Sequence, residues 1–194
     1  MSKNTFVLLL LACVGVYFGG VFMIPLMDID AAQYASISRE MLERNSFLQV
    51  FDLGKDYLDK PPMLFWLSAV SMKIFGIYDW AYRIPSLLFL GVALWATFKF
   101  AQLFYSTQVA RLATIILASS QAFFLMAHDV RTDTMLVGWV MLSKYLLAKW
   151  SETLRHQQKG ASPYFFIAIV AIAGGMMTKG PIALVVPVLA LAPH

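Results

Sequence analysis

The sequence is poor in charged residues and has a single cysteine. Charged residues make up 13% of the 194 residues, whereas hydrophobic residues make up 60%; soluble globular domains are about one quarter charged. The lone cysteine, Cys13, lies in an apolar run, so the chain can form neither an internal disulfide nor a cysteine-based metal site. The net charge of only +4 gives no indication of a nucleic-acid partner, and no glycine-rich nucleotide loop is visible. This composition predicts an integral membrane protein.

Long apolar runs divide the chain into predicted membrane spans. The first run, residues 6–26, is uncharged and has about the length that a bilayer crossing needs. It could be a signal peptide, but it has no clear small-residue cleavage site, so we predict a retained signal anchor. Later spans are predicted at residues 84–104, 109–127, 134–149 and 163–177, with a partial sixth from residue 181. We therefore expect an all-α, multi-span bundle that forms the N-terminal part of a longer protein.

One long polar segment, residues 28–83, separates the first two spans. It contains eight of the eleven carboxylates of the chain, and it is far longer than the connections of about four to six residues that are usual. Within it, residues 31–44 place apolar side chains at helical spacing with charges on the other side. This pattern predicts an amphipathic helix lying in the membrane interface. We expect the whole segment to carry the chemistry.

Residues 61–76 are apolar, but their length does not decide whether they cross the membrane. If they cross it, the basic loop 149–160 is exported, against the preference of Lys and Arg for cytoplasmic loops. If they lie flat, most basic residues outside the polar segment fall on or near the cytoplasmic side: Lys3, Lys99, Arg111, Lys144, Lys149, Arg155 and Lys159. We therefore predict that residues 61–76 lie flat and that residues 28–83 are extracytoplasmic.

Asp30 has two candidate roles at the end of the first span. It is a good N-cap for a helix that begins at Ala31, and Gln33 completes a pattern like a capping box. Its carboxylate could instead act as a general base at the membrane surface. A carboxylate has two oxygens, so the spacing leaves both roles open.

Lys60 stands directly before Pro61 and Pro62, at the mouth of an apolar helix. Its side chain could simply extend to water along apolar surface. It could also bind a phosphate, since one such pair at about 4 Å and an effective dielectric of about 20 contributes on the order of 4 kcal/mol before desolvation.

A second polar group is predicted on the same side of the membrane and consists of His128, Asp129, Arg131 and Asp133. Arg131 and Asp133 could form an ordinary exposed ion pair, which contributes about 0 to 1 kcal/mol. Lys179 lies between two apolar runs, where a charge requires a partner or a polar ligand. His128 has no second histidine or cysteine at ligand spacing, so it is a poor candidate metal ligand.

Five motifs, taken in order, resemble a known family. They are D-x-D-x-x-x-Y-A-x-I-S-R-E-M from residue 28, D-K-P-P-x-x-x-W-L from residue 59, F-G-x-x-x-W-x-x-R-I-P-S from residue 75, R-x-D-x-M-L from residue 131 and T-K-G-P from residue 178. This order is similar to the N-terminal half of polyprenyl-phosphate-sugar-dependent glycosyltransferases of the membrane GT-C fold. That family includes protein O-mannosyltransferase relatives and the aminoarabinose transferase that modifies lipid A. The resemblance covers nearly the whole chain.

The resemblance implies a catalytic aspartate in the first external loop. The spacing to Tyr34 matches this aspartate to Asp30. The family often has a glutamate where this chain has Ala31, so Asp28 is the second candidate for a catalytic role.

The resemblance also implies residues that bind the donor. Lys60 matches a lysine expected near the lipid phosphate, with Arg131 and Lys179 as further phosphate-binding candidates. Asp59 stands where some members of the family have a glutamate that binds a metal. The sequence therefore allows a divalent cation but does not require one. The supporting residues are then Asp59, Asp133 and Arg83.

The implied activity is a glycosyltransferase of the bacterial inner membrane that moves a sugar from a polyprenyl-phosphate donor. The acceptor would be a glycolipid, a protein or a glycan, membrane lipids would surround the site, and Asp30 would deprotonate the acceptor. Two alternatives remain: a multi-pass transporter or lipid flippase, and a non-catalytic fragment. Transporters tend to place polar sites near the bilayer midplane, whereas the charges here gather in one long loop. That distribution favours chemistry at the membrane surface.

Overall fold

The computed structural model describes residues 1–26, 29–156 and 160–191. Asp28 lies outside these residues, so its proposed role stays a prediction. Within the described residues the chain forms helices and one short hairpin: α1 (Lys3–Met23), α2 (Asp30–Glu43), β1 (Phe51–Asp52), β2 (Lys55–Asp56), α3 (Met63–Phe75), α4 (Asp79–Phe104), α5 (Thr107–Ala118), α6 (Gln121–His128), α7 (Thr132–Arg155), α8 (Ser162–Lys179) and α9 (Ile182–Leu191).

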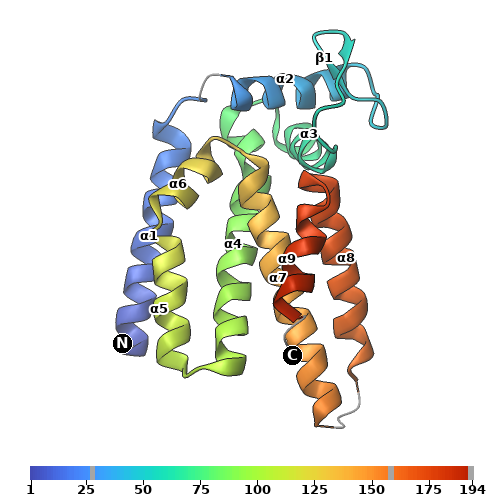
Figure 1. Cartoon of the computed structure of the whole chain (residues 1–194). Coiled ribbons are helices and arrows are strands. Elements are labelled where there is room, and N and C mark those ends of the chain that lie inside the picture. Colours follow the sequence, from blue (N-terminus) through green and yellow to red (C-terminus); the bar gives the residue numbers. More distant parts are fainter. Residues whose placement is uncertain (27–28, 157–159, 192–194) are drawn as a thin grey trace.

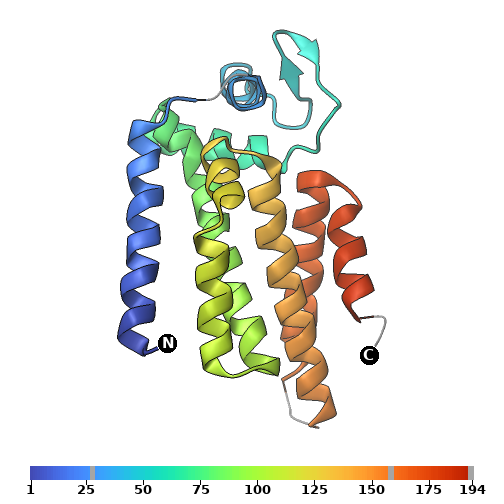
Figure 2. The ribbon, with the colours of Figure 1, turned by 60° about the vertical axis from the view of Figure 1, so that its left-hand side comes forward.

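The helices form a bundle that is crossed at one end by a second layer. Helices α1, α4, α5, α7 and α8 run side by side, while α2 and α3 lie across the end opposite the N-terminus (Figures 1 and 2). Helix α3 packs between α2 and the start of α4. The apolar segment 61–76 therefore lies across the bundle and does not run along it. The side of the membrane on which this layer sits stays a prediction.

The apolar helices make this a multi-pass membrane protein. By length and composition, α1, α4 and α8 can each cross a bilayer, and α5 with α6 makes a fourth crossing if the bent pair counts as one. The span predicted over residues 109–127 is not one continuous helix, because the chain bends by 53° between α5 and α6. Ser119 and Ser120 lie at the bend, and the Ser119 hydroxyl donates to the Ile116 carbonyl at 3.4 Å. Serine side chains compete with the helix for backbone groups in this way.

Helix α7 is longer than the predicted span 134–149 and is not apolar enough to count among the candidate spans. It packs between α4 and α8 instead (Figure 1). Glycines permit this close packing: a Cβ on Gly138 would lie 2.8 Å from the Phe89 side chain, and one on Gly174 would lie 2.7 Å from Trp139. Small residues at helix contacts are typical of membrane bundles.

The crosswise layer has its own core. Helix α2 buries Tyr34, Ile37 and Met41, spaced three and four residues apart, against apolar side chains of α3 and α4. Its outer face carries the ion pairs Arg39–Glu43 and Arg44–Glu40. The amphipathic helix predicted over residues 31–44 is therefore confirmed.

The hairpin of β1 and β2 was not predicted. Its two-residue turn, Leu53–Gly54, has positive φ at both positions, a geometry usually marked by Asn-Gly or Asp-Gly. The hairpin is tied to α2, because Gln33 Nε2 donates to Asp52 Oδ2 at 2.7 Å and the Gly54 N–H donates to Glu40 at 3.0 Å.

Cysteine labelling tests the side on which the crosswise layer lies. In a Cys13→Ser background, a cysteine at the exposed Leu48 should react with a membrane-impermeant thiol reagent added to intact cells. A cysteine at the exposed His156, at the other end of the bundle, should react only after the cells are opened. Labelling of position 156 in intact cells would contradict the predicted orientation.

Candidate functional site

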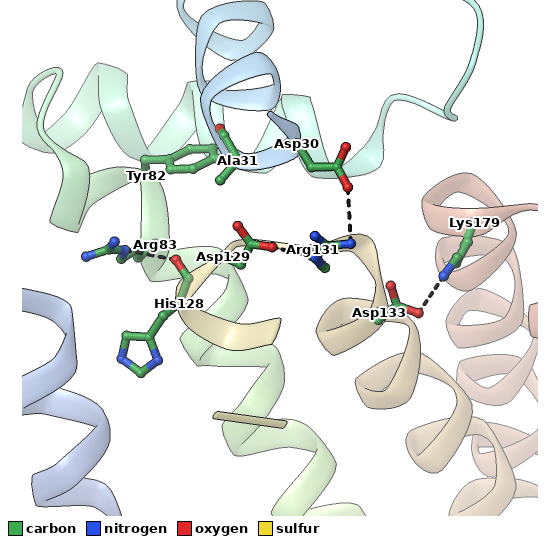
Figure 3. Close-up of polar contacts among 9 residues, drawn as sticks. All are labelled: Asp30, Ala31, Tyr82, Arg83, His128, Asp129, Arg131, Asp133 and Lys179. Atoms are coloured by element: carbon green, nitrogen blue, oxygen red, sulfur yellow. Dashed lines mark hydrogen bonds and ion pairs between the residues drawn. The ribbon is translucent and has the colours of Figure 1, made fainter. Parts of the chain in front are cut away.

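Three segments that are distant in sequence meet at the end of the bundle that α2 crosses (Figure 3). Arg131, in the turn between α6 and α7, places Nη1 3.1 Å from Asp30 Oδ2 at the start of α2. The same guanidinium donates through Nε to Asp129. Lys179, at the end of α8, pairs with Asp133 in the first turn of α7. The structure thus brings together four candidates, Asp30, Arg131, Asp133 and Lys179. Asp129, which the sequence analysis placed in the second polar group without a role, joins them.

Asp30 does not cap α2, so the first of its two candidate roles does not hold. The helix begins at Asp30 itself, the preceding Ile29 has φ of 73°, and no side chain caps the helix start. Gln33 does not complete a capping box either, because it donates to Asp52 instead. Asp30 therefore lies in the first helical turn, where the helix dipole favours a negative charge. Its side chain is 37% exposed and faces Arg131, so it is accessible to a ligand.

Two β-branched residues with positive φ flank the site. Ile29 (φ 73°) precedes Asp30, and Val130 (φ 50°) separates Asp129 from Arg131. Val130 is fully buried, and the next N–H, that of Arg131, closes helix α6 by donating to the Met126 carbonyl at 3.1 Å. Glycine is usual at such a position, and other residues there cost about 1–3 kcal/mol. Such strain is typical of functional sites.

Arg83 binds backbone carbonyls beside the site and does not contact the carboxylates of the site. It is 1% exposed and donates to the carbonyls of Val21 at 2.7 Å, Pro25 at 3.0 Å and His128 at 3.1 Å. Its guanidinium points towards α1, away from Asp30 (Figure 3). These carbonyls lie at or just beyond the ends of α1 and α6, where orphan acceptors need partners. Arg83 thereby fixes the start of the segment that carries Asp129 and Arg131.

His128 faces carbonyl groups and not a metal. Its ring is fully buried, with Nδ1 2.8 Å from the Phe124 carbonyl and Nε2 2.9 Å from the Tyr17 carbonyl. Gly20 makes room for the ring, because a Cβ there would lie 2.5 Å from Nε2. Among the residues that the structure describes, no cluster of three or more His, Cys, Asp or Glu side chains could hold a metal. Asp59, the candidate metal ligand, is exposed.

Lys60 lies half-buried between β2 and α3 and pairs with no carboxylate in the described part of the chain. Tyr57, in the same segment, and Tyr34 of α2 both pack edge-on against Phe65, with ring centroids at 5.7 and 5.5 Å. Burial, and then the neighbouring Asp30, raise the pKa of Tyr34, while burial and then Tyr34 raise the pKa of Tyr57. Both hydroxyls thus stay protonated at neutral pH. The sequence analysis did not name either tyrosine as a site residue.

The site combines a carboxylate with fixed cations. Hydrogen bonding to Asp129 is the main cause that raises the pKa of Arg131, so this guanidinium stays charged. Asp30 can accept a proton, while Arg131 and Lys179 can stabilise a nearby anion. All three lie at the end of a membrane bundle, where an amphiphilic ligand could present its polar head.

Sequence comparisons identify a family and relatives with stated activities. The family model described as dolichyl-phosphate-mannose-protein mannosyltransferase matches residues 59–192. The undecaprenyl phosphate-alpha-4-amino-4-deoxy-L-arabinose arabinosyl transferase of Serratia proteamaculans is 33% identical over 187 residues, which are 92% of this chain and 33% of that protein. The enzyme of the same name from Yersinia enterocolitica is 31% identical over 192 residues, 94% of this chain and 34% of that protein. The chain spans about a third of the length of these curated relatives.

Solved structures share the fold. The crystal structure of ArnT from Cupriavidus metallidurans in the apo state matches with a TM-score of 0.85 and 21% identity, covering 98% of this chain and 35% of that one. The structure of the same protein bound to undecaprenyl phosphate matches with a TM-score of 0.86 and 21% identity, covering 100% and 36%. The likeness confirms the predicted GT-C-like helical bundle.

Replacing Arg83 tests its role in holding α1 and α6 together. Arg83→Gln should lower the free energy of unfolding in detergent by about 3 kcal/mol or more, since each buried carbonyl that loses its partner costs about 1–3 kcal/mol. The matched control is Arg39→Gln, whose side chain is 59% exposed and whose loss should cost less than about 1 kcal/mol. Equal unfolding curves for the two variants would contradict this role.

Proposed function

Because the chain belongs to the dolichyl-phosphate-mannose-protein mannosyltransferase family, we propose that it is the N-terminal part of a membrane glycosyltransferase with a polyprenyl-phosphate sugar donor. The names of the relatives support undecaprenyl phosphate as the carrier and an aminoarabinose-type sugar. A related protein has been solved with undecaprenyl phosphate bound. The acceptor would be a glycolipid of the lipid A type. The enzyme would lie in the bacterial inner membrane with its site on the extracytoplasmic side.

The observation that carries this proposal is the placement of Asp30. Its side chain does not cap α2, is 37% exposed, and lies 3.1 Å from the guanidinium of Arg131 at the end of the bundle. Asp30 would take the proton of the acceptor oxygen as that oxygen bonds to the anomeric carbon. The bond from that carbon to the donor phosphate oxygen breaks at the same time, and its electron pair leaves with the phosphate. Attack from the face opposite the phosphate would invert the anomeric centre.

The departing phosphate needs positive charge near it. Lys60 pairs with no described carboxylate, whereas Arg131 and Lys179 each pair with at least one. Lys60 is therefore the cation whose charge is least compensated and the first candidate to contact the phosphate. Arg131 can add to it, since its side chain is 46% exposed. Donors placed where charge develops in the transition state accelerate the reaction.

A lipid donor also explains the position of the site. Helix α3 leaves Val70, Ile74 and Phe75 exposed at the end of the bundle that carries Asp30. Helix α8, which contacts α3, also exposes apolar side chains, among them Phe166, Ile167 and Val170. A polyprenyl chain could lie along such a surface while its phosphate stays at the height of the crosswise layer.

Asp30→Asn tests the catalytic assignment in the natively expressed protein. Sugar transfer should fall by at least about a hundredfold, the lower range of general base catalysis, while binding of a short polyprenyl phosphate should change little. Asp28→Asn should lose less activity. The matched control is Asp56→Asn, at an exposed hairpin residue that accepts from Gln49, which should retain normal transfer. Near-normal turnover of Asp30→Asn would remove Asp30 as the base.

Substitutions at Lys60 distinguish a lysine that binds the donor phosphate from one that only extends to water. Lys60→Ala should weaken polyprenyl phosphate binding and slow transfer, because the same contact serves the bound donor and strengthens as the phosphate leaves. Lys60→Arg should recover affinity better than turnover, since the planar guanidinium keeps the charge but not the position. The measurements are lipid binding and transfer of labelled sugar. If Lys60→Ala binds the lipid as tightly as the native protein, Lys60 does not bind the phosphate.

A further inference from the structure

Asp129 is a buried carboxylate that the proposed reaction does not use. The residue is 4% exposed, and its Oδ2 accepts from Arg131 Nε. Its Oδ1 is buried and has no hydrogen-bond partner among the described residues. Removing a carboxylate from water is costly unless it is paired and hydrogen-bonded. With one charged partner and one unsatisfied oxygen, Asp129 costs more free energy to bury than an apolar residue that only fills space.

The backbone around Asp129 is strained in a way that serves the contact with Arg131. The buried Val130 between them has φ of 50°. This turn lets the Arg131 side chain reach back to a residue only two positions earlier in the chain (Figure 3). The strain is tolerated because Arg83 and the contacts of His128 hold the preceding helix end. Local strain of this kind persists only where the surroundings impose it.

Arg131 is held on one side and accessible on the other. Its Nε faces the buried Asp129, while its Nη1 lies 3.1 Å from the partly exposed Asp30. A guanidinium has five N–H groups in a rigid fork, so the terminal nitrogens can change partner while Nε keeps its own. An exposed pair is weak in water, whereas breaking a buried pair leaves an uncompensated charge. An arriving anion would therefore compete with Asp30 and not with Asp129.

We propose that Asp129 is a positioning residue that anchors Arg131 through Nε, so that its terminal nitrogens pass from Asp30 to the donor phosphate when the lipid binds. This inference rests on the proposed function. Binding of the donor would then also release the Asp30 carboxylate from its ion pair and leave it free to accept the acceptor proton. Donor binding and activation of the base would be coupled through one side chain.

Asp129→Asn in the natively expressed protein tests the anchor. Affinity for a short polyprenyl phosphate should fall roughly tenfold to a hundredfold, because truncating a fully buried charge pair has effects of that size or larger and here one of the two partners, Asp129, is buried. The melting temperature should stay level or rise, because the amide has the same shape and removes a buried charge. A purely structural role would instead lower stability and leave the affinity of the folded fraction unchanged. Asp56→Asn is again the control, with native affinity and stability.

A second comparison holds even if Arg131→Gln alone fails to fold. The double variant Asp129→Asn/Arg131→Gln removes both charges of the Asp129–Arg131 pair. It leaves Asp30 without its partner, but that carboxylate is 37% exposed to water. Its affinity should lie within about threefold of Asp129→Asn alone, because an unanchored Arg131 already contributes little; coupled residues are non-additive in this sense. A further tenfold loss in the double variant would show that Arg131 binds without its anchor, and would overturn the proposal.

The same assay separates this inference from the proposed function. If the native protein binds the lipid and Lys60→Ala weakens binding, but Asp129→Asn binds like the native protein, only the anchoring role is overturned. If the folded native protein binds no polyprenyl phosphate, both proposals are overturned.

Discussion

The structure depends on one buried guanidinium. In a bilayer, the last carbonyls of a helix find no water, so every helix end at that depth needs internal partners. Arg83 supplies three donors to carbonyls at or beyond the ends of α1 and α6, and His128 approaches two more carbonyls. Two helices that end at the same height are thereby joined. The segment that leads from α1 to Asp30 therefore starts from a fixed position. The same holds for the segment that leads from α6 to Arg131.

This frame explains how the crosswise layer can carry a site. Tyr82 of α4 donates to the carbonyl of Ala31 at 3.2 Å, so the start of α2 is tied to the helix that also carries Arg83. The carboxylate of Asp30 and the guanidinium of Arg131 then meet from two segments a hundred residues apart in sequence. Catalytic groups need positions fixed to within a fraction of an ångström. Here the rigid elements are helices locked to each other, and the proposed catalytic residues stand at their ends.

The sequence predicted the parts of this fold that depend on apolar length, helical spacing and charge. It predicted the amphipathic helix and the flat segment 61–76. It also placed Asp30, Arg131, Asp133 and Lys179 on one side of the membrane as site candidates. It did not predict the bend at Ser119 or the hairpin, and it left open whether Asp30 caps α2. Capping depends on the backbone angles of Ile29, and the Asp129–Arg131 contact depends on positive φ at Val130. Tertiary packing imposes both conformations on residues that avoid them, so no local pattern could reveal them.

The distribution of charge suits a reaction in which negative charge grows on the leaving group. A lipid-linked sugar phosphate is a phosphodiester with one negative charge, whereas the released lipid phosphate is a monoester with close to two at neutral pH. Only an interaction that strengthens during the reaction lowers the barrier. Lys179 is bound to Asp133, so much of its charge is already compensated before the donor arrives. Lys60 has no described carboxylate partner. Arg131 pairs with both Asp129 and Asp30, and only its pair with Asp30 is exposed on both sides. Lys60 can therefore respond most to the added charge. In the proposed mechanism, Asp30 would lose its ion pair as the terminal nitrogens of Arg131 turn to the phosphate.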